Sequence, residues 1–104
     1  MVTKTDIIDK LKEVNDPELG ISIVDMGLVY EVKVKEDKSK KRWYAEIKIT
    51  FTTPACPMMN YMLEQIKQKL EEIENFDAEL IVIFDPPWSP DRMSKEAKIK
   101  LGIL

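Results

Sequence analysis

The chain begins with apolar side chains at the spacing of an amphipathic helix. Over residues 3–14, four aliphatic side chains fall on one helical face: Ile7, Ile8, Leu11 and Val14. Thr3 is a candidate N-cap, and Asp6 lies in the first turn, where an acidic side chain is favourable. Because Pro17 disfavours helical geometry at the residue before it, we expect the helix to end there and a turn to follow over residues 16–20.

Two strands are expected next. From Leu28 to Lys35, apolar side chains alternate with charged ones, which is the two-residue period of a half-buried strand. The polar run over residues 36–42 predicts a hairpin loop. A second alternating segment follows over residues 43–51, with its aromatic and aliphatic residues facing inward and Thr50 among those facing solvent.

The second half of the chain predicts a long helix, a third strand and a short last helix. Apolar residues keep helical spacing from Pro57 to about Asn75. Residues 78–84 are apolar on nearly both faces, which suggests a strand covered on both sides, for instance by a partner. Ser89 can cap a last helix with Pro90 at its first position.

The predicted order of elements is therefore α-β-β-α-β-α. This order indicates an α/β fold, an α+β two-layer sandwich with a three-stranded mixed sheet. The crossover helix between the second and third strands should be right-handed if those strands are parallel. At 104 residues, we expect residues 1–104 to form a single domain.

Composition and charge exclude several classes of function. The net charge of −3 argues against nucleic acid as a partner, because phosphate binding needs a basic face. No apolar run approaches the roughly 20 residues of a membrane span, and the N-terminus lacks a signal peptide, so we expect a cytoplasmic protein. The single cysteine fits a reducing compartment. The absence of histidine removes Ser-His-Asp and Cys-His catalysis.

Cys56 is the first candidate for chemistry. It stands between a predicted strand and a predicted helix, and Pro57 suits the first helical position, so Cys56 is the expected N-cap. A thiol there would face unpaired backbone N–H groups and the positive end of the helix dipole, which lower its pKa and raise its nucleophilicity or metal affinity. The alternative is that Cys56 is a small buried apolar side chain.

Polar residues before the first strand and after the second are further candidates. The carboxylates of Asp16, Glu18 and Asp25 could ligate a hard metal, receive a basic group of a partner or serve as acid and base. Turn formation is the simpler account, since Asp before Pro is common where the chain reverses. Thr52 and Thr53 could line the same pocket, although threonine is ordinary at a strand end.

Two apolar residues could contact a partner. Helical spacing places Met59 and Met62 in the core and leaves Met58 less certain. Trp88 lies in a proline-rich loop, where it could anchor a partner or pack over the edge of the core.

Four short motifs follow one another along the chain. They are Asp16-Pro17-Glu18-Leu19-Gly20, Val24-Asp25-Met26-Gly27-Leu28-Val29, Thr52-Thr53-Pro54-Ala55-Cys56-Pro57 and Phe84-Asp85-Pro86-Pro87-Trp88-Ser89-Pro90. In this order and at these spacings they resemble the SufT and PaaD-like family, also called domain of unknown function fifty-nine. The resemblance covers nearly the whole chain.

The resemblance implies the fold of the iron-sulfur cluster assembly domain and a role in maturing iron-sulfur proteins. It implies as partners a P-loop ATPase iron-sulfur carrier or apo iron-sulfur proteins. Carried onto this chain, the family's functional positions are Cys56 first, then Asp16 and Glu18, with Thr52, Thr53 and Asp25 around them. Cys56 is also the expected contact to iron or to a cluster.

Three functions follow as hypotheses. The first is an accessory factor that uses Cys56 to hold or hand over iron or a cluster. The second is a non-catalytic subunit or maturation factor of a multicomponent oxygenase of the PaaD type, although such chains generally carry extra C-terminal cysteines that this sequence lacks. The third, a cysteine-dependent enzyme, ranks last because no histidine can activate the thiol, so we expect no enzymatic activity.

One sulfur per chain limits what the chain can hold. Cluster irons are ordinarily bound by about four thiolates. We therefore expect a transient cluster or iron shared with a partner, and none in the isolated monomer. The apolar third strand would also permit a homodimer.

Overall fold

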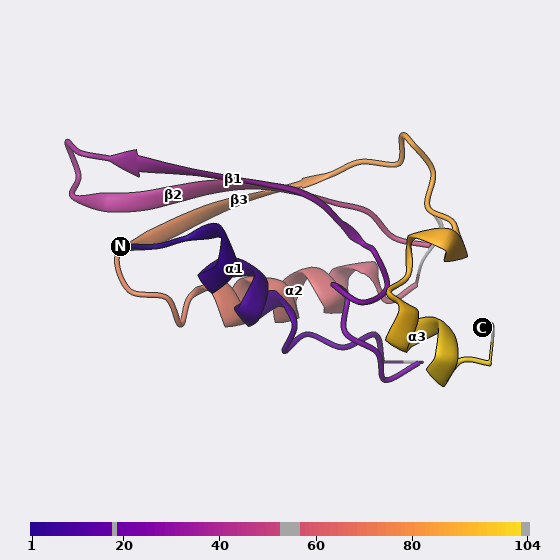
Figure 1. Ribbon diagram of the computed structural model, residues 1–104. Coiled ribbons are helices and arrows are strands. Elements are labelled where there is room, and N and C mark those ends of the chain that lie inside the picture. The colour runs from indigo at the N-terminus through magenta and orange to yellow at the C-terminus, as the bar shows by residue number, and fades with distance from the viewer. Residues whose placement is uncertain (18, 53–56, 103–104) are drawn as a thin grey trace.

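The computed structural model describes residues 1–17, 19–52 and 57–102. Its centre is a three-stranded sheet in the order β1-β2-β3 (Figure 1). Strand β1 (Val29–Asp37) pairs antiparallel with β2 (Arg42–Ile49), and β2 pairs parallel with β3 (Phe76–Val82). The mixed sheet predicted from the sequence is confirmed.

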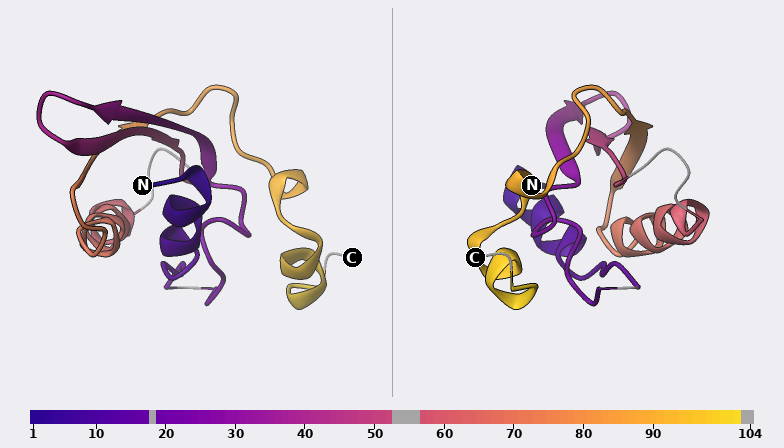
Figure 2. Two further views of the ribbon diagram at one scale, coloured as in Figure 1. Left: turned by 60° about the vertical axis from the view of Figure 1, so that its left-hand side comes forward. Right: turned by 90° about the vertical axis from the view of Figure 1, so that its right-hand side faces the viewer.

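Helices cover one face of this sheet. Helix α1 (Lys4–Leu11) and helix α2 (Met59–Leu70) lie side by side beneath it, while α3 (Lys95–Lys100) stands apart, beyond the end of the strands (Figures 1 and 2). A 3₁₀ turn (Pro90–Arg92) precedes α3. The order α-β-β-α-β-α and the two-layer sandwich are confirmed. In the described part of the chain, none of the helices has the length and apolar character needed to cross a bilayer.

Helix α1 begins as predicted and ends early. The Thr3 hydroxyl accepts a hydrogen bond from the Asp6 N–H, and the Asp6 carboxylate accepts one from the Thr3 N–H, which makes a capping box. The helix ends at Leu11 and not at Val14. Val14 is still buried in the core, and its carbonyl accepts a hydrogen bond from the Ile23 N–H in the returning chain.

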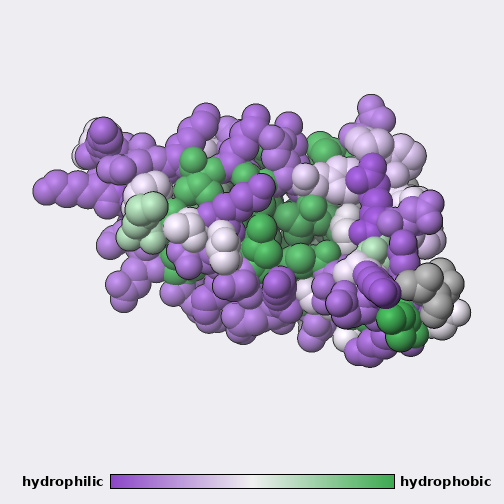
Figure 3. Space-filling view, in the orientation of Figure 1, coloured by the Kyte–Doolittle hydropathy of each residue, from purple (hydrophilic) through white to green (hydrophobic). Residues whose placement is uncertain are grey.

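The core lies between the sheet and the two long helices. Ala45, Ile47 and Ile49 of β2 are essentially inaccessible and face Ile7 of α1 and Ile66 of α2 across one apolar cluster. Seen from the side drawn in Figure 1, apolar side chains reach the surface between the sheet and the helices, and hydrophilic ones surround them (Figure 3).

The structure corrects the prediction for Thr50. Its side chain was expected to face solvent, yet only 1% of the residue is exposed. The Thr50 N–H donates to the Leu28 carbonyl beyond the end of the regular strand, so the chain before β1 encloses this residue. The buried hydroxyl donates to the Phe51 carbonyl at 3.4 Å, which gives it a partner without water.

Several boundaries differ from the sequence pattern. Helix α2 begins at Met59 and ends at Leu70, because residues 71–75 form turns before β3. Strand β3 begins at Phe76, and its residues 80–82 are half-buried, so the chain itself does not cover both faces of this strand. Ser89 precedes the 3₁₀ turn, and the side-chain cap of α3 is Ser94.

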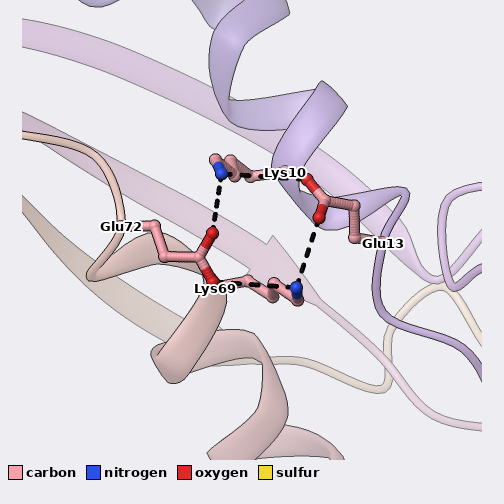
Figure 4. A network of polar contacts seen from close by, with 4 residues as sticks. All are labelled: Lys10, Glu13, Lys69 and Glu72. Atoms are coloured by element: carbon pink, nitrogen blue, oxygen red, sulfur yellow. Dashed lines mark hydrogen bonds and ion pairs between the residues drawn. The ribbon is translucent and has the colours of Figure 1, made fainter.

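A ring of four charged residues joins α1 to α2 (Figure 4). Lys10 Nζ lies 2.8 Å from Glu72 Oε1, and Lys69 Nζ lies 3.2 Å from Glu13 Oε1. Longer contacts of 3.8 Å (Lys10 to Glu13) and 3.6 Å (Lys69 to Glu72) close the ring. The hydrogen bond from Lys10 lowers the pKa of the Glu72 carboxyl and raises the pKa of Lys10.

Breaking this ring should loosen the packing of α1 on α2 in a way that depends on salt. We expect Lys10→Met and Glu72→Gln each to lower the midpoint of thermal unfolding, and the double variant to lose less than the sum, because both changes remove the same pair. The coupling energy between Lys10 and Glu72 should fade in about 1 M salt, where the Debye length is only about 3 Å.

The same coupling should fade in acid. Because the folded-state pKa of Glu72 is lowered, its contribution is complete above the ordinary value of 4.5 and is lost as the pH falls through the lowered pKa. Lys12→Met, at an exposed lysine without an ion pair among the described residues, removes the same charge and is the control. Equal effects of Lys10→Met and Lys12→Met would contradict a stabilising ring.

Candidate functional site

The predicted site residues that the structure describes come from segments that meet at one end of the sheet. Val29 at the start of β1 pairs with Ile49 at the end of β2, and Ile49 pairs with Val82 at the end of β3. The chain before β1, the chain after β2 and the chain after β3 therefore meet there, opposite the hairpin tip (Figures 1 and 2). The carboxyl ends of parallel strands are a common place for binding sites in α/β proteins.

Asp16 organises the turn in which it lies. Its N–H donates to the Ile21 carbonyl, its carbonyl accepts from the Gly20 N–H, and its carboxylate accepts from the Leu19 N–H at 3.1 Å. Gly20 has a φ of +68°, a conformation that favours glycine. The expected turn-forming role of Asp16 is confirmed, and a role toward metal or a partner stays a prediction.

Asp25 lies in a shallow groove between this loop and α3. The groove has a volume of about 240 Å³, and Asn15, Ser22 and Asp25 face Glu96 and Lys100 across it. The Asp25 carbonyl accepts a hydrogen bond of 2.7 Å from the Ser94 N–H, which fixes the position of the half-buried aspartate. Within the described residues, no cluster of three or more Asp, Glu, Cys or His side chains is arranged to hold a metal ion.

A set of close contacts holds the chain after β3 against the chain around the start of β1. The indole Nε1 of Trp88 donates to the Met26 carbonyl at 2.7 Å, and the Tyr30 hydroxyl donates to the Pro86 carbonyl at 2.9 Å. The Arg92 guanidinium lies over the Tyr30 ring, 4.4 Å from its centre. We call these contacts, together with the Gly27–Arg92 contact described next, the loop clasp.

Gly27 is the tightest point of the loop clasp. Its φ is +75°, and a Cβ atom built on it would lie 2.3 Å from the Arg92 carbonyl oxygen. Only glycine fits such a backbone contact. The sequence analysis missed the roles of Tyr30 and Arg92. The one signal in the sequence was Gly27 itself, since a glycine can mark a close approach of another segment.

The structure gives Trp88 an internal role. It is half-buried against the core, and its one polar atom is bound to Met26. The expectation that it packs over the edge of the core is confirmed, and contact with a partner stays a prediction.

Thr52 and Met58 lie on either side of a segment outside the described residues. Thr52 is exposed, and Met58 is half-buried and occupies the N-cap position of α2. The prediction that Cys56 caps this helix is therefore wrong, because the helix begins at Met59. Proline is favourable in a first helical turn but does not force a helix to begin there.

Three predicted site residues, Glu18, Thr53 and Cys56, lie outside the described residues. Of the others, Asp25 and Trp88 are linked through the loop clasp, since Trp88 binds the residue after Asp25. Thr52 and Met58 do not line the groove that contains Asp25. The described candidates thus share one end of the molecule without forming one pocket.

Comparison with known proteins places this arrangement in a family. The family described as iron-sulfur cluster assembly protein matches residues 4–81. The chain belongs to this family. The match includes β1, β2, α2 and most of β3, together with the whole segment that carries Cys56.

Two similar proteins have names that describe the maturation of iron-sulfur proteins. The chain is 40% identical over 101 residues to the Fe-S protein maturation auxiliary factor YitW of Bacillus subtilis, a match covering 96% of this chain and 94% of that one. It is 42% identical over 89 residues to the Fe-S protein maturation auxiliary factor SufT of Staphylococcus aureus, covering 85% and 96%. The resemblance to SufT inferred from the four motifs is confirmed.

A carrier and a solved structure extend the comparison. An iron-sulfur cluster carrier protein of Deinococcus radiodurans is 28% identical over 67 residues, which cover 64% of this chain and 17% of the carrier. A crystal structure of a domain of unknown function fifty-nine from Bacillus anthracis superposes with a TM-score of 0.84 at 38% identity, covering 97% of this chain and 92% of that one. The assembly-domain fold is thus confirmed.

The loop clasp predicts unequal responses at two glycines. In Gly20→Ala, nothing lies within 4 Å of the new Cβ atom, so the cost is the positive φ alone, about 1 kcal/mol. In Gly27→Ala, the Arg92 backbone must also move away, and we expect a loss of at least about 3 kcal/mol. Denaturant unfolding measures both, and losses equal within error would show that the Gly27–Arg92 contact does not matter for stability.

Proposed function

We propose that this chain is an accessory factor in iron-sulfur cluster assembly or transfer, acting in the cytoplasm, with Cys56 as its reactive or metal-binding thiol. The observation that carries the proposal is the family match over residues 4–81, which spans the chain's single cysteine. The two relatives named as maturation auxiliary factors support the accessory role. Their names favour it over an oxygenase subunit and over an enzyme.

The chemistry of the side chains supports the choice of Cys56. Thiolate is the soft ligand that iron-sulfur clusters use, and carboxylates such as Asp16 and Asp25 suit harder metals. The chain has no second cysteine and no histidine to offer. Since the cap of α2 is Met58, this proposal does not rest on a thiol activated by the helix terminus. It rests on the sulfur as a ligand.

A partner must complete the coordination. One sulfur falls short of the roughly four thiolates that hold a cluster, so iron or a cluster is expected to be shared and transient. We propose a P-loop ATPase iron-sulfur carrier or an apo iron-sulfur protein as that partner. The carrier protein of Deinococcus radiodurans contains a segment similar to this chain, which supports a working relation between the two kinds of domain.

The acidic and hydroxyl side chains at the same end are proposed to contact the partner. Asp25 and Glu96 outnumber Lys100 among the charged residues that line the groove, and Thr52 is exposed beyond the end of β2. With Asp16, Glu18 and Thr53 they would receive basic or polar groups around the shared metal. The loop clasp would hold these loops in place while the partner docks.

Replacing the thiol should abolish cluster delivery and leave the fold intact. We expect Cys56→Ser to keep the circular dichroism spectrum and unfolding midpoint of the wild type, because serine is close to cysteine in size. Transfer to an apo acceptor enzyme under anaerobic conditions should fall at least tenfold, because a hydroxyl is a poor ligand for a cluster. Met59→Leu, a volume-conserving change at a half-buried residue packed on the core, is the control. Unchanged transfer by Cys56→Ser would refute the role of the thiol.

The isolated monomer should not retain a stable cluster. After anaerobic reconstitution with iron and sulfide, size-exclusion chromatography should give a monomer without cluster absorbance, because one thiolate cannot hold a cluster alone. A carrier that supplies its own cysteines should bring iron, sulfide and this chain into one peak. A monomeric peak with stoichiometric iron and sulfide, in the absence of added thiols, would contradict shared coordination.

A further inference from the structure

The outer edge of β3 has unpaired backbone groups. The Ile83 N–H donates to the Ile49 carbonyl, and the Asn75 carbonyl accepts from the Trp43 N–H. The odd-numbered residues of β3 therefore direct their backbone groups toward β2. Because backbone direction alternates along a strand, the even-numbered residues point the other way: Phe76, Ala78, Leu80 and Val82. No strand in the described part of the chain pairs with that edge.

A groove with an apolar floor and charged residues at its margin runs beside this edge, on the helical side of the sheet. It has a volume of about 450 Å³. Lys67 and Leu70 of α2 and Glu71, which follows the helix, line one side, and residues 76–78 and Leu80 of β3 line the other. Ala78 is exposed, although its neighbour Ala45 on β2 is completely buried on the same face. The space beside Ala78 is thus open, since no side chain of the described residues fills it.

The other face of the same edge carries two acidic side chains, Asp77 and Glu79. Asp77 is held by Arg42, whose Nε lies 2.9 Å from the carboxylate. Glu79 accepts a hydrogen bond from the Tyr44 hydroxyl, and this contact raises the pKa of Tyr44 to about 12. Among the described residues, no lysine or arginine forms an ion pair with Glu79. Its charge is available to a cation from outside.

The two edges of the sheet differ in their protection. Strand β1 has an irregular register between Val29 and Glu31 and carries exposed lysines at positions 33 and 35, features that discourage strand addition. Between Phe76 and Val82, β3 has neither lysine nor proline, and its ladder with β2 is regular. The open edge is therefore β3.

We propose that the β3 edge binds an extended segment of a partner protein as a fourth strand. Apolar side chains of the segment enter the groove beside Ala78 and Leu80, and alternate Lys or Arg side chains lie next to Glu79. Backbone hydrogen bonds supply affinity, and the two faces select an alternating apolar and basic sequence. This inference goes beyond the function proposed above and does not depend on Cys56.

The arrangement of α2 favours a single segment over a second copy of this chain. Viewed along the strands, α2 extends beyond β3 (Figure 2, right). Antiparallel pairing of two β3 edges would put both α2 helices on the same face, where each overhangs toward the other. Packed helices need about 8–10 Å between axes, whereas an added strand needs about 4.8 Å. A single added strand therefore fits above the overhanging part of α2. A second copy of the chain would bring its own α2 into the same space, and the two helices would clash.

Peptide selection followed by mapping tests the proposal. Linear peptides of about 12 residues from a random displayed library, long enough for one strand, are selected on the wild-type protein and counter-selected on Ala78→Pro. Proline removes the outward N–H of residue 78 and leaves the ladder to β2 in place, as is tolerated on an edge. Ala78→Ser keeps that N–H at the same position and is the control. Circular dichroism and the unfolding midpoint establish that each variant is folded.

The expected result is a set of peptides with alternating apolar and basic residues. They should bind Ala78→Pro at least tenfold more weakly than wild type and Ala78→Ser within about twofold, and they should perturb the amide resonances of residues 76–82. Glu79→Gln, which keeps an acceptor for Tyr44, should weaken binding severalfold and remove its dependence on salt.

Three outcomes would overturn the proposal. They are failure to enrich any peptide, equal binding to Ala78→Pro and wild type, and perturbations confined to residues outside the β3 edge. Sedimentation of the wild type as a dimer that Ala78→Pro dissociates would also overturn it, because a second copy would then occupy the edge. No iron or cluster is used, so the result is independent of the test on Cys56.

Discussion

The parallel pairing of β2 with β3 is the constraint on which the rest of this structure depends. Parallel neighbours cannot be joined by a tight turn, so the chain must leave the end of β2, cross beneath the sheet as α2 and return to the start of β3. The crossing supplies the helix that covers the third strand, and the charged ring spans that helix and α1. It also makes β2 and β3 end side by side, next to the start of β1. The described candidate residues lie in the segments that precede β1 or follow β2 and β3. The topology of the sheet places all of these segments at that one end.

The loops that meet at this end of the sheet are not held by strand pairing or by a long helix. They need contacts with one another to keep a fixed position. Here the loop clasp does this. Gly27 lets the Arg92 backbone approach, Trp88 binds the Met26 carbonyl, and Arg92 covers the ring of Tyr30. Two of the four sequence motifs are therefore two halves of one contact, which accounts physically for the glycine in one and the tryptophan in the other. The chemistry that we propose for this protein falls to the remaining motifs, which carry the thiol and the first carboxylates.

The sequence was most informative where both members of an interaction lie within one turn or one period. Thr3 and Asp6 cap α1 as predicted because they are three residues apart, and the alternation of side chains gave the strands. Predictions failed where the contacting residue is distant in the sequence, or where a residue type allows a structure without requiring it. Thr50 is buried because Leu28 covers its backbone, and Pro57 is compatible with a helix start without fixing one. The contact of Tyr30 with Arg92 joins segments from the two halves of the chain, and no local pattern marks either residue.

A factor with one sulfur and no histidine has little chemical selectivity of its own, since a single thiolate is an unspecific ligand for soft metals. Selection of the correct partner must then come from another surface, and strand addition at β3 is suited to this because it joins backbone affinity to a pattern of side chains. The geometry connects the two surfaces. Val82, at the end of β3, lies beside Ile49, where β2 ends and the segment leading to Cys56 begins. A segment added along the β3 edge would extend toward that end of the sheet, so recognition at the edge would bring the partner's own ligands to the end from which the segment with the proposed thiol departs.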